Sequence, residues 1–297
     1  MKKILFVVNP KSGKGKIRSH LMDIIDIFNQ NEMDVTVYIT QKPMDACEVA
    51  KRRAEEFDML ICSGGDGTLD EVVTGMLKGG HHRPVGYIPA GSTNDFANSL
   101  KLPLQMKEAA KSIAKEHPYA CDVGSFNGDY FVYIAAFGLF TDVAYETKQD
   151  MKNVLGHLAY LLEGAKRLFN IKNYHMKIRT HEEAIEGDFI YGMVTNSQSV
   201  GGFRNITGKQ VCLNDGVFEV TLIRTPKNGM ELEEILAALV SREMDNKRVY
   251  SFKADYVEFE SQEEVPWTLD GENGGKHQKA TVINHKQAFN IMITQEL

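Results

Sequence analysis

Three glycine-rich segments could hold phosphate groups, and the second is the most informative. This second loop, 63–71, reads Ser-Gly-Gly-Asp-Gly-Thr-Leu-Asp-Glu. Each glycine costs folding entropy, so three of them around one carboxylate, Asp66, indicate a backbone that must approach a ligand closely. Asp66 would then orient a metal ion or the reacting hydroxyl. A plain helix start, with Thr68 as N-cap and Glu71 completing a capping box, leaves the Gly-Gly-Asp-Gly run unexplained.

Two further loops carry residues of the same kind. The first loop, 9–16, reads Asn-Pro-Lys-Ser-Gly-Lys-Gly-Lys. Its glycines and lysines suit a phosphate at a helix N-terminus, but an ordinary strand–helix turn with solvated lysines fits as well. It matches neither a Walker A loop nor the dinucleotide-binding fingerprint. The third loop, 89–97, gathers Ser, Thr, Asn and Asp where a helix should begin, so helix capping is the alternative there.

These loops follow predicted strands of an alternating strand–helix pattern in the first 125 residues. Strands are predicted at 4–8, 35–39, 59–62 and 85–88, and helices at 17–28, 46–57, 69–76 and 104–115. Such alternation is typical of a doubly wound α/β domain with a mainly parallel sheet. The carboxyl ends of its strands share one edge, where ligands bind, so we expect the three loops to meet there.

The second half has the pattern of an antiparallel β-sandwich. Strands are predicted at 119–137, 174–180, 186–196, 217–224, 249–260, 265–269 and 279–294, with helices near 153–169 and 229–242. Turns are predicted at Asn127–Gly128, Glu186–Gly187, Asp215–Gly216 and Asp270–Gly271. No linker is apparent, so we expect the two domains to pack closely, with a cleft between them.

Composition narrows the classes of function. The chain has 297 residues, 43% hydrophobic and 25% charged, which excludes a disordered chain, a collagen-like repeat and a disulfide-built miniprotein. A net charge of −6 argues against a nucleic-acid partner. The four cysteines lie apart and predict reduced thiols. The longest apolar stretch, 131–140, is too short to span a bilayer, so we expect a cytoplasmic protein that could still touch a membrane.

Four motifs together resemble the diacylglycerol kinase catalytic-domain family, which groups bacterial lipid kinases with sphingosine and ceramide kinases. They are Asn9-Pro10-x-Ser12-Gly13, Gly64-Gly65-Asp66-Gly67-Thr68, Gly91-Ser92-x-Asn94-Asp95 and Asp270-Gly271-Glu272. The motifs occur in the expected order from residue 9 to residue 272, so the resemblance covers essentially the whole chain. It is strongest to the soluble bacterial diacylglycerol kinases.

The resemblance implies a nucleotide-binding α/β domain over 1–125 and a lipid-substrate β-sandwich domain over 126–287, with 288–297 returning to the first domain. It implies an ATP site with contacts at Asn9, Pro10, Lys11, Ser12, Gly13, Thr40, Gly65, Asp66, Gly67, Thr68, Leu69, Asp70, Glu71 and Ser92. Two positions depart from the family pattern. Ser92 stands where relatives often have Thr and keeps the hydroxyl, whereas Asp70 stands where they often have Asn and adds negative charge near the phosphates.

The resemblance also assigns Glu272 as the general base, which takes the proton of a lipid hydroxyl as that hydroxyl attacks the γ-phosphorus of ATP. Asp270 and Asp66 would support this base or hold Mg²⁺. Taken in isolation, the Asp270–Gly271–Glu272 sequence is typical of a plain hairpin turn.

Two features of the second half extend the resemblance. A structural Mg²⁺ site is implied at Asp215 and the main-chain carbonyls of Cys212 and Val217, because oxygen ligands suit this ion; a type I′ hairpin is the alternative. The segment 158–169 has the pattern of an amphipathic helix, which either covers a core or lies at a membrane interface.

Three functions remain open at this point. The first is an ATP- and Mg²⁺-dependent kinase of a lipid hydroxyl, most directly of diacylglycerol giving phosphatidic acid; a related glycerolipid, a sphingoid base and a prenol are also compatible acceptors. The second is an NAD kinase-like enzyme, because that family also has a Gly-Gly-Asp-Gly loop. The third is a non-catalytic nucleotide-sensing module. We expect a membrane lipid as the partner. Peripheral membrane contact at the inner face is one further option, and a homodimer, by analogy with bacterial relatives, is another.

Overall fold

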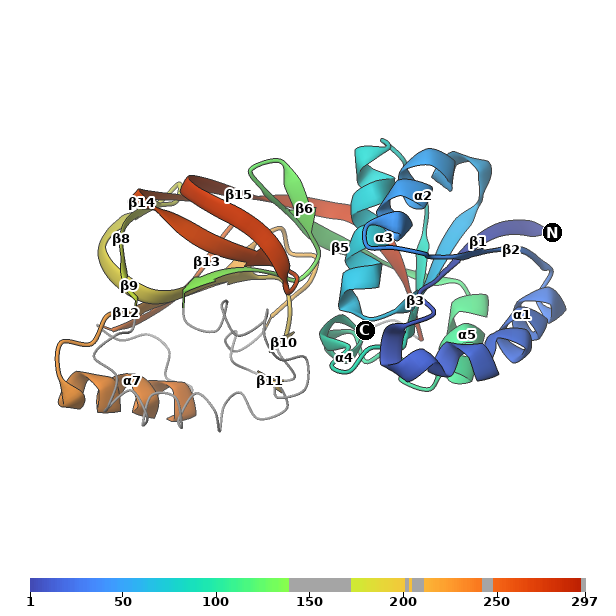
Figure 1. Cartoon of the computed structure of the whole chain (residues 1–297), viewed down its shortest axis with the longest axis horizontal. Coiled ribbons are helices and arrows are strands. Elements are labelled where there is room, and N and C mark those ends of the chain that lie inside the picture. The colour runs from blue at the N-terminus through green and yellow to red at the C-terminus, as the bar shows by residue number, and fades with distance from the viewer. Residues whose placement is uncertain (139–171, 201–202, 205–210, 242–247, 295–297) are drawn as a thin grey trace. The chain divides into compact units, whose positions relative to one another are not determined.

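The computed structural model describes residues 1–138, 172–200, 203–204, 211–241 and 248–294 (Figure 1). The chain divides into two compact units. Unit 1 comprises Met1–Val123 and Lys286–Leu297, and unit 2 comprises Gly124–His285. These divisions fall two residues before the expected boundaries at 125 and 287.

Unit 1 is built on a parallel sheet. Its strands are β1 (Lys2–Val8), β2 (Met33–Ile39), β3 (Met59–Gly64) and β4 (Val85–Pro89), in the order β2-β1-β3-β4. Ile291 of β15 (Glu272–Ile293) pairs in parallel with Val85 at the β4 edge. Residues 4–8 and 85–89 are buried without interruption, as a sheet covered on both faces requires. The doubly wound α/β fold expected for this half is confirmed.

Helices cover both faces of this sheet, with α2 and α3 on one side and α1 and α5 on the other (Figure 1). The helices are the 3₁₀ segments η1 (Ser12–Ser19) and η2 (Ala54–Glu56), with α1 (Leu21–Gln30), α2 (Asp45–Arg53), α3 (Asp66–Lys78), α4 (Asp95–Ser99) and α5 (Met106–Ala114). Phe28 of α1 and Ile113 of α5 share an apolar cluster with Phe6 of β1. On the other face Gly75 lets α3 approach α2, because a Cβ there would lie 2.1 Å from the carbonyl oxygen of Cys47.

The segment after β1 differs from the prediction of a helix over 17–28. Ile17 is buried, but it lies in η1, and the α-helix begins only at Leu21. His20, with φ of −114° and ψ of −8°, departs from α-helical backbone and separates η1 from α1. The structure also contains the short helix α4, which is not among the helices predicted from the sequence.

Unit 2 is an antiparallel β-structure. Its elements are the end of β5 (His117–Phe126), β6 (Asp129–Phe131), β7 (Ile134–Gly138), β8 (Tyr174–Arg179), β9 (Ala184–Thr195), β10 (Ser199–Val200), β11 (Phe203–Arg204), β12 (Phe218–Arg224), α7 (Gly229–Ser241), β13 (Val249–Ala254), β14 (Tyr256–Leu269) and most of β15. Both β9 and β14 pair antiparallel with β7 and with β8. These four strands therefore close around an apolar interior.

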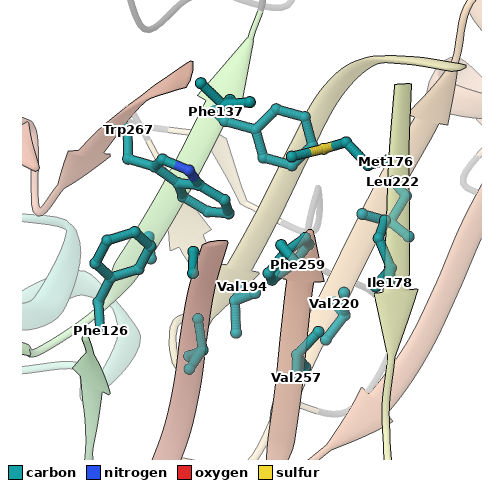
Figure 2. Close-up of a cluster of buried hydrophobic side chains, with 14 of the residues drawn as sticks. Phe126, Phe137, Met176, Ile178, Val194, Val220, Leu222, Val257, Phe259 and Trp267 are labelled. Atoms are coloured by element: carbon teal, nitrogen blue, oxygen red, sulfur yellow. The ribbon is translucent and has the colours of Figure 1, made fainter. Parts of the chain in front are cut away.

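An aromatic core fills this interior (Figure 2). The ring centroid of Trp267 lies 4.8 Å from that of Phe126, 4.9 Å from that of Phe137 and 5.0 Å from that of Phe259. Figure 2 shows these rings among aliphatic side chains of neighbouring strands. Large buried rings of this kind contribute much of the burial energy of a β-sandwich core.

Several predicted strand limits in unit 2 are wrong. The range 119–137 forms three strands, because Asn127 and Gly128 have φ angles of 50° and 92° and make the tight turn that their sequence predicts. The ranges 249–260 and 265–269 are instead β13 and the long β14. Strand β15 begins at residue 272, ahead of the predicted 279.

Two predicted turns also differ from the structure. Glu186 and Gly187 lie inside β9, where they pair with β8 rather than reversing the chain. Gly216 has a φ of 91°, but the φ of Asp215 is not positive, so the type I′ alternative for this pair is wrong. The helix predicted near 153–169, including the amphipathic segment 158–169, lies outside the described residues.

Replacing Phe137 by Ala should lower the free energy of unfolding of unit 2 by roughly 3–5 kcal/mol, because the lost ring leaves a cavity. Urea unfolding followed by fluorescence measures this change, since Trp267 is the single tryptophan and contacts Phe137. The control is Met230→Ala, because the Met230 side chain is 73% exposed. Equal effects of the two substitutions would contradict the position of this core.

Candidate functional site

The three glycine-rich loops leave the same edge of the unit 1 sheet. They follow β1, β3 and β4, which are parallel neighbours, and the second and third loops lead into α3 and α4. Ligands of open α/β sheets bind at the carboxyl ends of such strands. The structure therefore brings together the three segments that the sequence predicts to meet.

Only glycine fits where these loops touch. A Cβ on Gly13 would lie 2.0 Å from the carbonyl oxygen of Ala90, and a Cβ on Gly91 would lie 2.7 Å from the Cα of Gly65. Any side chain at these two positions would push the loops apart. Their backbones thus approach one another directly, which leaves backbone N–H groups near a shared ligand position.

The backbone of the first loop is left-handed over three successive residues. Gly13, Lys14 and Gly15 have φ angles of 54°, 63° and 73°. Lys11 before them has right-handed backbone, and a turn from right-handed to left-handed backbone directs successive N–H groups into a concavity that binds anions. Lys11, Lys14 and Lys16 are exposed and add positive charge. The arrangement suits a phosphate chain.

A side-chain hydrogen bond joins the first and second loops. Asn9 Nδ2 donates to Thr68 Oγ1 at 3.1 Å, and Asn9 Oδ1 accepts from the N–H of Lys11 at 3.0 Å. The N–H of Asn9 donates to the carbonyl oxygen of Ser63 at 2.9 Å. Asn9 therefore holds the start of the first loop against the second.

The buried carboxylate of Asp66 joins the second loop to the third. It accepts from the N–H of Asp95 at 2.9 Å and from the N–H of Phe96 at 3.2 Å. The hydroxyls of Thr93 and Tyr87 each donate to it at 3.5 Å. Asp66 is 8% exposed, so its charge is stabilised by protein donors rather than by bulk water. These contacts make Asp66 the residue that fixes the two loops together.

Glu71 of the second loop stabilises another helix. Its carboxylate accepts from the N–H of Met44 at 3.0 Å and from the N–H of Ala46 at 3.1 Å, at the start of α2. Helix α3 has Gly65 as its N-cap. The capping-box interpretation of Thr68 with Glu71 is therefore wrong.

Thr40 and Asp70 flank the loops. The N–H of Thr40 donates to the carbonyl oxygen of Val8 at 2.9 Å, so Thr40 lies beside the end of β1. Within α3, Thr74 donates to Asp70 Oδ1 at 3.3 Å. The additional charge of Asp70 is thus engaged by the helix that carries it.

The exposure of the remaining predicted nucleotide-contact residues shows which of them can offer a ligand their side chains and which only their main chain. Lys11 and Ser92 are exposed, while Pro10, Ser12 and Gly67 are partly buried. Leu69 is completely buried and can offer a ligand only its main chain.

Two residues outside the predicted set complete this edge. Asn94 has a φ of 52°, and its Oδ1 accepts from the N–H of Gly91 at 2.8 Å. The hydroxyl oxygen of Tyr87 lies 3.3 Å from the carbonyl oxygen of Gly64, so its one hydrogen is shared between this carbonyl and Asp66. Asparagine tolerates left-handed backbone and closes turns on its own main chain, so the sequence carried a signal for Asn94. A tyrosine in a buried strand carries no such signal.

In unit 2, Asp270 anchors the turn between β14 and β15. Asp270 and Gly271 have φ angles of 51° and 84°, as in a type I′ turn. The Asp270 carboxylate accepts from the N–H groups of Val132 at 2.6 Å, Tyr133 at 3.0 Å and Ile134 at 2.8 Å. Asp270 is 5% exposed, whereas Glu272 is exposed. Of the two carboxylates, Glu272 is the one accessible to a substrate.

The implied structural metal site lies just before β12. Asp215 Oδ1 accepts from the N–H of Val217 at 3.2 Å, and Oδ2 accepts from Lys253 Nζ at 3.0 Å. The same ammonium is 3.2 Å from Glu219 Oε1. Burial raises the pKa of Glu219 to about 7, against the attraction of Lys253. The ammonium of Lys253 therefore pairs with the carboxylates of both Asp215 and Glu219.

This donor set fits an additional cation. The thiol of Cys212 donates to Asn214 Oδ1 at 3.1 Å, so Cys212 would offer its carbonyl oxygen rather than its sulfur. Glu219 Oε2 is buried without a hydrogen-bond partner among the described residues, and a nearby cation would compensate its charge. Within the described ranges no cluster of three or more His, Cys, Asp or Glu side chains could hold a metal. In the implied set only Asp215 would donate a side-chain oxygen, because Cys212 and Val217 would donate main-chain carbonyls. Oxygen donors alone suit Mg²⁺.

Comparison with known proteins identifies the family. A model of the diacylglycerol kinase catalytic domain matches residues 3–126, and a model of the YegS C-terminal NAD kinase beta sandwich-like domain matches residues 136–291. The diacylglycerol kinase of Bacillus subtilis (strain 168) is 32% identical over 93% of this chain and 91% of its own length. The chain belongs to the diacylglycerol kinase family. The diacylglycerol kinase of Staphylococcus carnosus (strain TM300) is 31% identical over 100% of this chain and 96% of its own length.

The solved structures agree with this membership. A crystal structure of a candidate diacylglycerol kinase from Bacillus anthracis str. Sterne matches with a TM-score of 0.83 and 25% identity, covering 98% of this chain and 95% of that one. The order of an α/β domain followed by a β-sandwich-like domain is confirmed. As a member of this diacylglycerol kinase family the chain is a kinase, which decides against a non-catalytic nucleotide-sensing module. None of the helices in the described ranges has the length and apolarity to cross a bilayer.

Replacing Gly13 by Ala should weaken ATP binding by at least about ten-fold, because the new Cβ would displace the first loop from the third. Calorimetric titration with ATP measures the affinity. Gly80→Ala is the matched control, since Gly80 also has a left-handed φ of 71° but nothing lies within 4 Å of its Cβ position. Unchanged affinity in the Gly13 variant would show that the loop contact does not matter for nucleotide binding.

Proposed function

We propose that this kinase transfers the γ-phosphate of ATP, taken with Mg²⁺, to the hydroxyl of a membrane lipid. Diacylglycerol is the favoured acceptor, and phosphatidic acid would be the product. The observation that carries the proposal is the meeting of three glycine-rich loops at one sheet edge, with backbone contacts that only glycine permits. Two curated relatives named diacylglycerol kinase support the choice of acceptor. The homodimer and the peripheral membrane contact stay predictions.

The nucleotide part of the proposal rests on unit 1. The left-handed turn of residues 13–15, the lysines of the first loop and the N-terminus of α3 all offer positive potential to phosphate oxygens. Phosphoryl transfer depends mainly on positioning and charge neutralisation. When bound, Mg²⁺ would supply part of that neutralisation.

Glu272 is the general base of the proposal. The lipid oxygen attacks the γ-phosphorus, the bond from the γ-phosphorus to the β–γ bridging oxygen breaks, ADP leaves, and the hydroxyl proton passes to the Glu272 carboxylate. Asp270 and Asp66 are positioning residues in this scheme. Their carboxylates are already engaged by backbone N–H donors, which supports a role in holding loops rather than in binding a metal directly.

An NAD kinase-like activity is the second candidate, because the family model that matches residues 136–291 describes an NAD kinase beta sandwich-like domain. The two functions differ in the acceptor hydroxyl, which belongs to a lipid in one case and to NAD in the other. Incubation with labelled ATP and each acceptor separates them. Label in extracted lipid supports the first function, and label in NADP supports the second.

Glu272→Gln should abolish turnover while leaving the fold and ATP affinity unchanged, because the amide keeps the shape of the side chain but cannot accept the proton. Lipid phosphorylation, calorimetric ATP binding and thermal unfolding together measure these three properties. Glu263→Gln is the control, since Glu263 is an exposed carboxylate of the neighbouring strand β14. Full activity of purified Glu272→Gln would remove Glu272 as the base.

Mg²⁺ without nucleotide should raise the melting temperature of the wild-type chain but not that of Asp215→Ala, because the single side-chain donor of the implied site is then lost. Thermal unfolding with and without MgCl₂ measures this. Asp188→Ala removes an exposed carboxylate that pairs with His175 and serves as the control. The same shift in Asp215→Ala as in the wild type would locate the stabilising ion elsewhere.

A further inference from the structure

The hairpin that carries Glu272 contains a β-bulge. The register of the β14–β15 ladder shifts opposite Trp267, which faces both Gly274 and Gly275. The flanking pairs are Leu269–Glu272, Thr268–Asn273 and Pro266–Lys276. Bulges of this kind redirect side chains and recur beside active sites.

The bulge determines the face of the sheet on which Glu272 lies. Residues paired across an antiparallel ladder share a face. Val265 pairs with His277 on one side of the bulge, and Leu269 pairs with Glu272 on the other. Four steps along β14 are therefore matched by five steps along β15. Because side chains alternate along a strand, loss of the extra residue would turn Glu272 to the opposite face.

Two side chains hold the bulge in place. Asn273 Oδ1 accepts from the N–H of Gly275 at 2.8 Å, and His277 Nε2 lies 2.8 Å from the carbonyl oxygen of Gly274. Gly275 has a φ of 83°, and a Cβ there would lie 2.9 Å from His277 Nε2. The imidazole of His277 therefore both packs on the bulge and hydrogen-bonds to it.

The amide of Asn127 fixes the tautomer of His277. Its Oδ1 accepts from the N–H of Thr281 at 2.9 Å, and its Nδ2 donates to the carbonyl oxygen of Lys279 at 3.1 Å. The orientation of the amide is thus set, and Nδ2 also lies 3.3 Å from His277 Nδ1. That ring nitrogen must accept, so the hydrogen-bond network assigns the proton to Nε2, which donates it to Gly274.

The ring of His277 is also packed against the core. It lies edge-on to Phe126, with ring centroids 5.2 Å apart. Phe126 in turn packs against Trp267, the residue opposite the bulge (Figure 2). His277 therefore lies between Phe126 of the aromatic core and the bulge, where it is partly buried.

We propose that His277 is a positioning residue, which keeps Glu272 on its working face by holding the Gly274–Gly275 bulge. The proposal rests on the proposed function of Glu272 as the base. His277 does not touch substrate in this scheme; it acts through the backbone of the hairpin. Its loss should therefore reduce the chemical step and leave nucleotide binding in unit 1 unaffected.

The test compares two substitutions of His277. Leucine fills similar space but cannot hydrogen-bond, so His277→Leu should lower kcat for lipid phosphorylation by at least about ten-fold with an unchanged KM for ATP, as expected for a displaced catalytic group. Glutamine can donate to Gly274 and accept from Asn127, so His277→Gln should restore most of kcat. His175→Leu removes an imidazole that pairs with Asp188 on β8 and β9, and serves as the control.

A second measurement follows the bulge without using activity. Amide hydrogen exchange of Gly275 should accelerate in His277→Leu and stay slow in His277→Gln. The ¹⁵N shifts of the wild-type imidazole should show the proton on Nε2. Tryptophan fluorescence of Trp267 reports whether each variant keeps its core.

The outcomes separate this inference from the proposed function. Loss of kcat in His277→Leu, rescue in His277→Gln and faster exchange of Gly275 only in the leucine variant support it. Full activity of His277→Leu beside an inactive Glu272→Gln overturns it and leaves the proposed function intact. Equal loss in both His277 variants with a disturbed core shows a merely structural role and also overturns it. Full activity of Glu272→Gln removes Glu272 as the base and overturns the role of His277 with it, while the lipid phosphorylation measured there still supports the proposed kinase.

Discussion

The candidate nucleotide site depends on how closely three backbone segments can approach one another. At the contacts of Gly13 with Ala90 and of Gly91 with Gly65 there is no room for a Cβ. Because backbone rather than side chains makes these contacts, N–H groups form much of the surface that a phosphate would meet. Parallel neighbouring strands supply three such loops at one edge, so the fold of unit 1 is a precondition for the site.

Each unit contains a buried aspartate whose carboxylate holds a distant backbone segment in place. Asp66 accepts from the backbone of Asp95 and Phe96, and Asp270 accepts from the backbone of residues 132–134. In both cases one carboxylate satisfies several N–H donors of a segment distant in sequence. A buried charge is stable when it is fully hydrogen-bonded, and removing it would leave those donors unsatisfied. The loops expected to do chemistry are thus fixed by charges that remain inside the protein.

The sequence predicts the architecture well because architecture follows from the spacing of apolar residues. The buried runs at 4–8 and 85–89 and the strand–helix alternation are enough to place three loops at one edge. Local geometry is harder to predict. Residues 12–19 form η1, which ends at His20, so α1 begins only at Leu21, and nothing in the apolar pattern indicates this. The hydrogen-bond partners of Asp66 are equally hard to predict from the sequence. An aspartate can cap a helix, ligate a metal or support a base, and only its tertiary contacts decide which of these it does.

The contrast between Asp270 and Glu272 explains how Glu272, the proposed base, can be held in place and still react. The three N–H donors around Asp270 stabilise its carboxylate form, so Asp270 is suited to fixing the turn rather than to taking up a proton. A general base must exchange hydrogen-bond partners during the reaction, and strong bonds to its carboxylate would oppose that exchange. The orientation of Glu272 is instead set by strand register, through the bulge on which His277 packs. Register constrains the Cα–Cβ direction and leaves the carboxylate itself available for the proton.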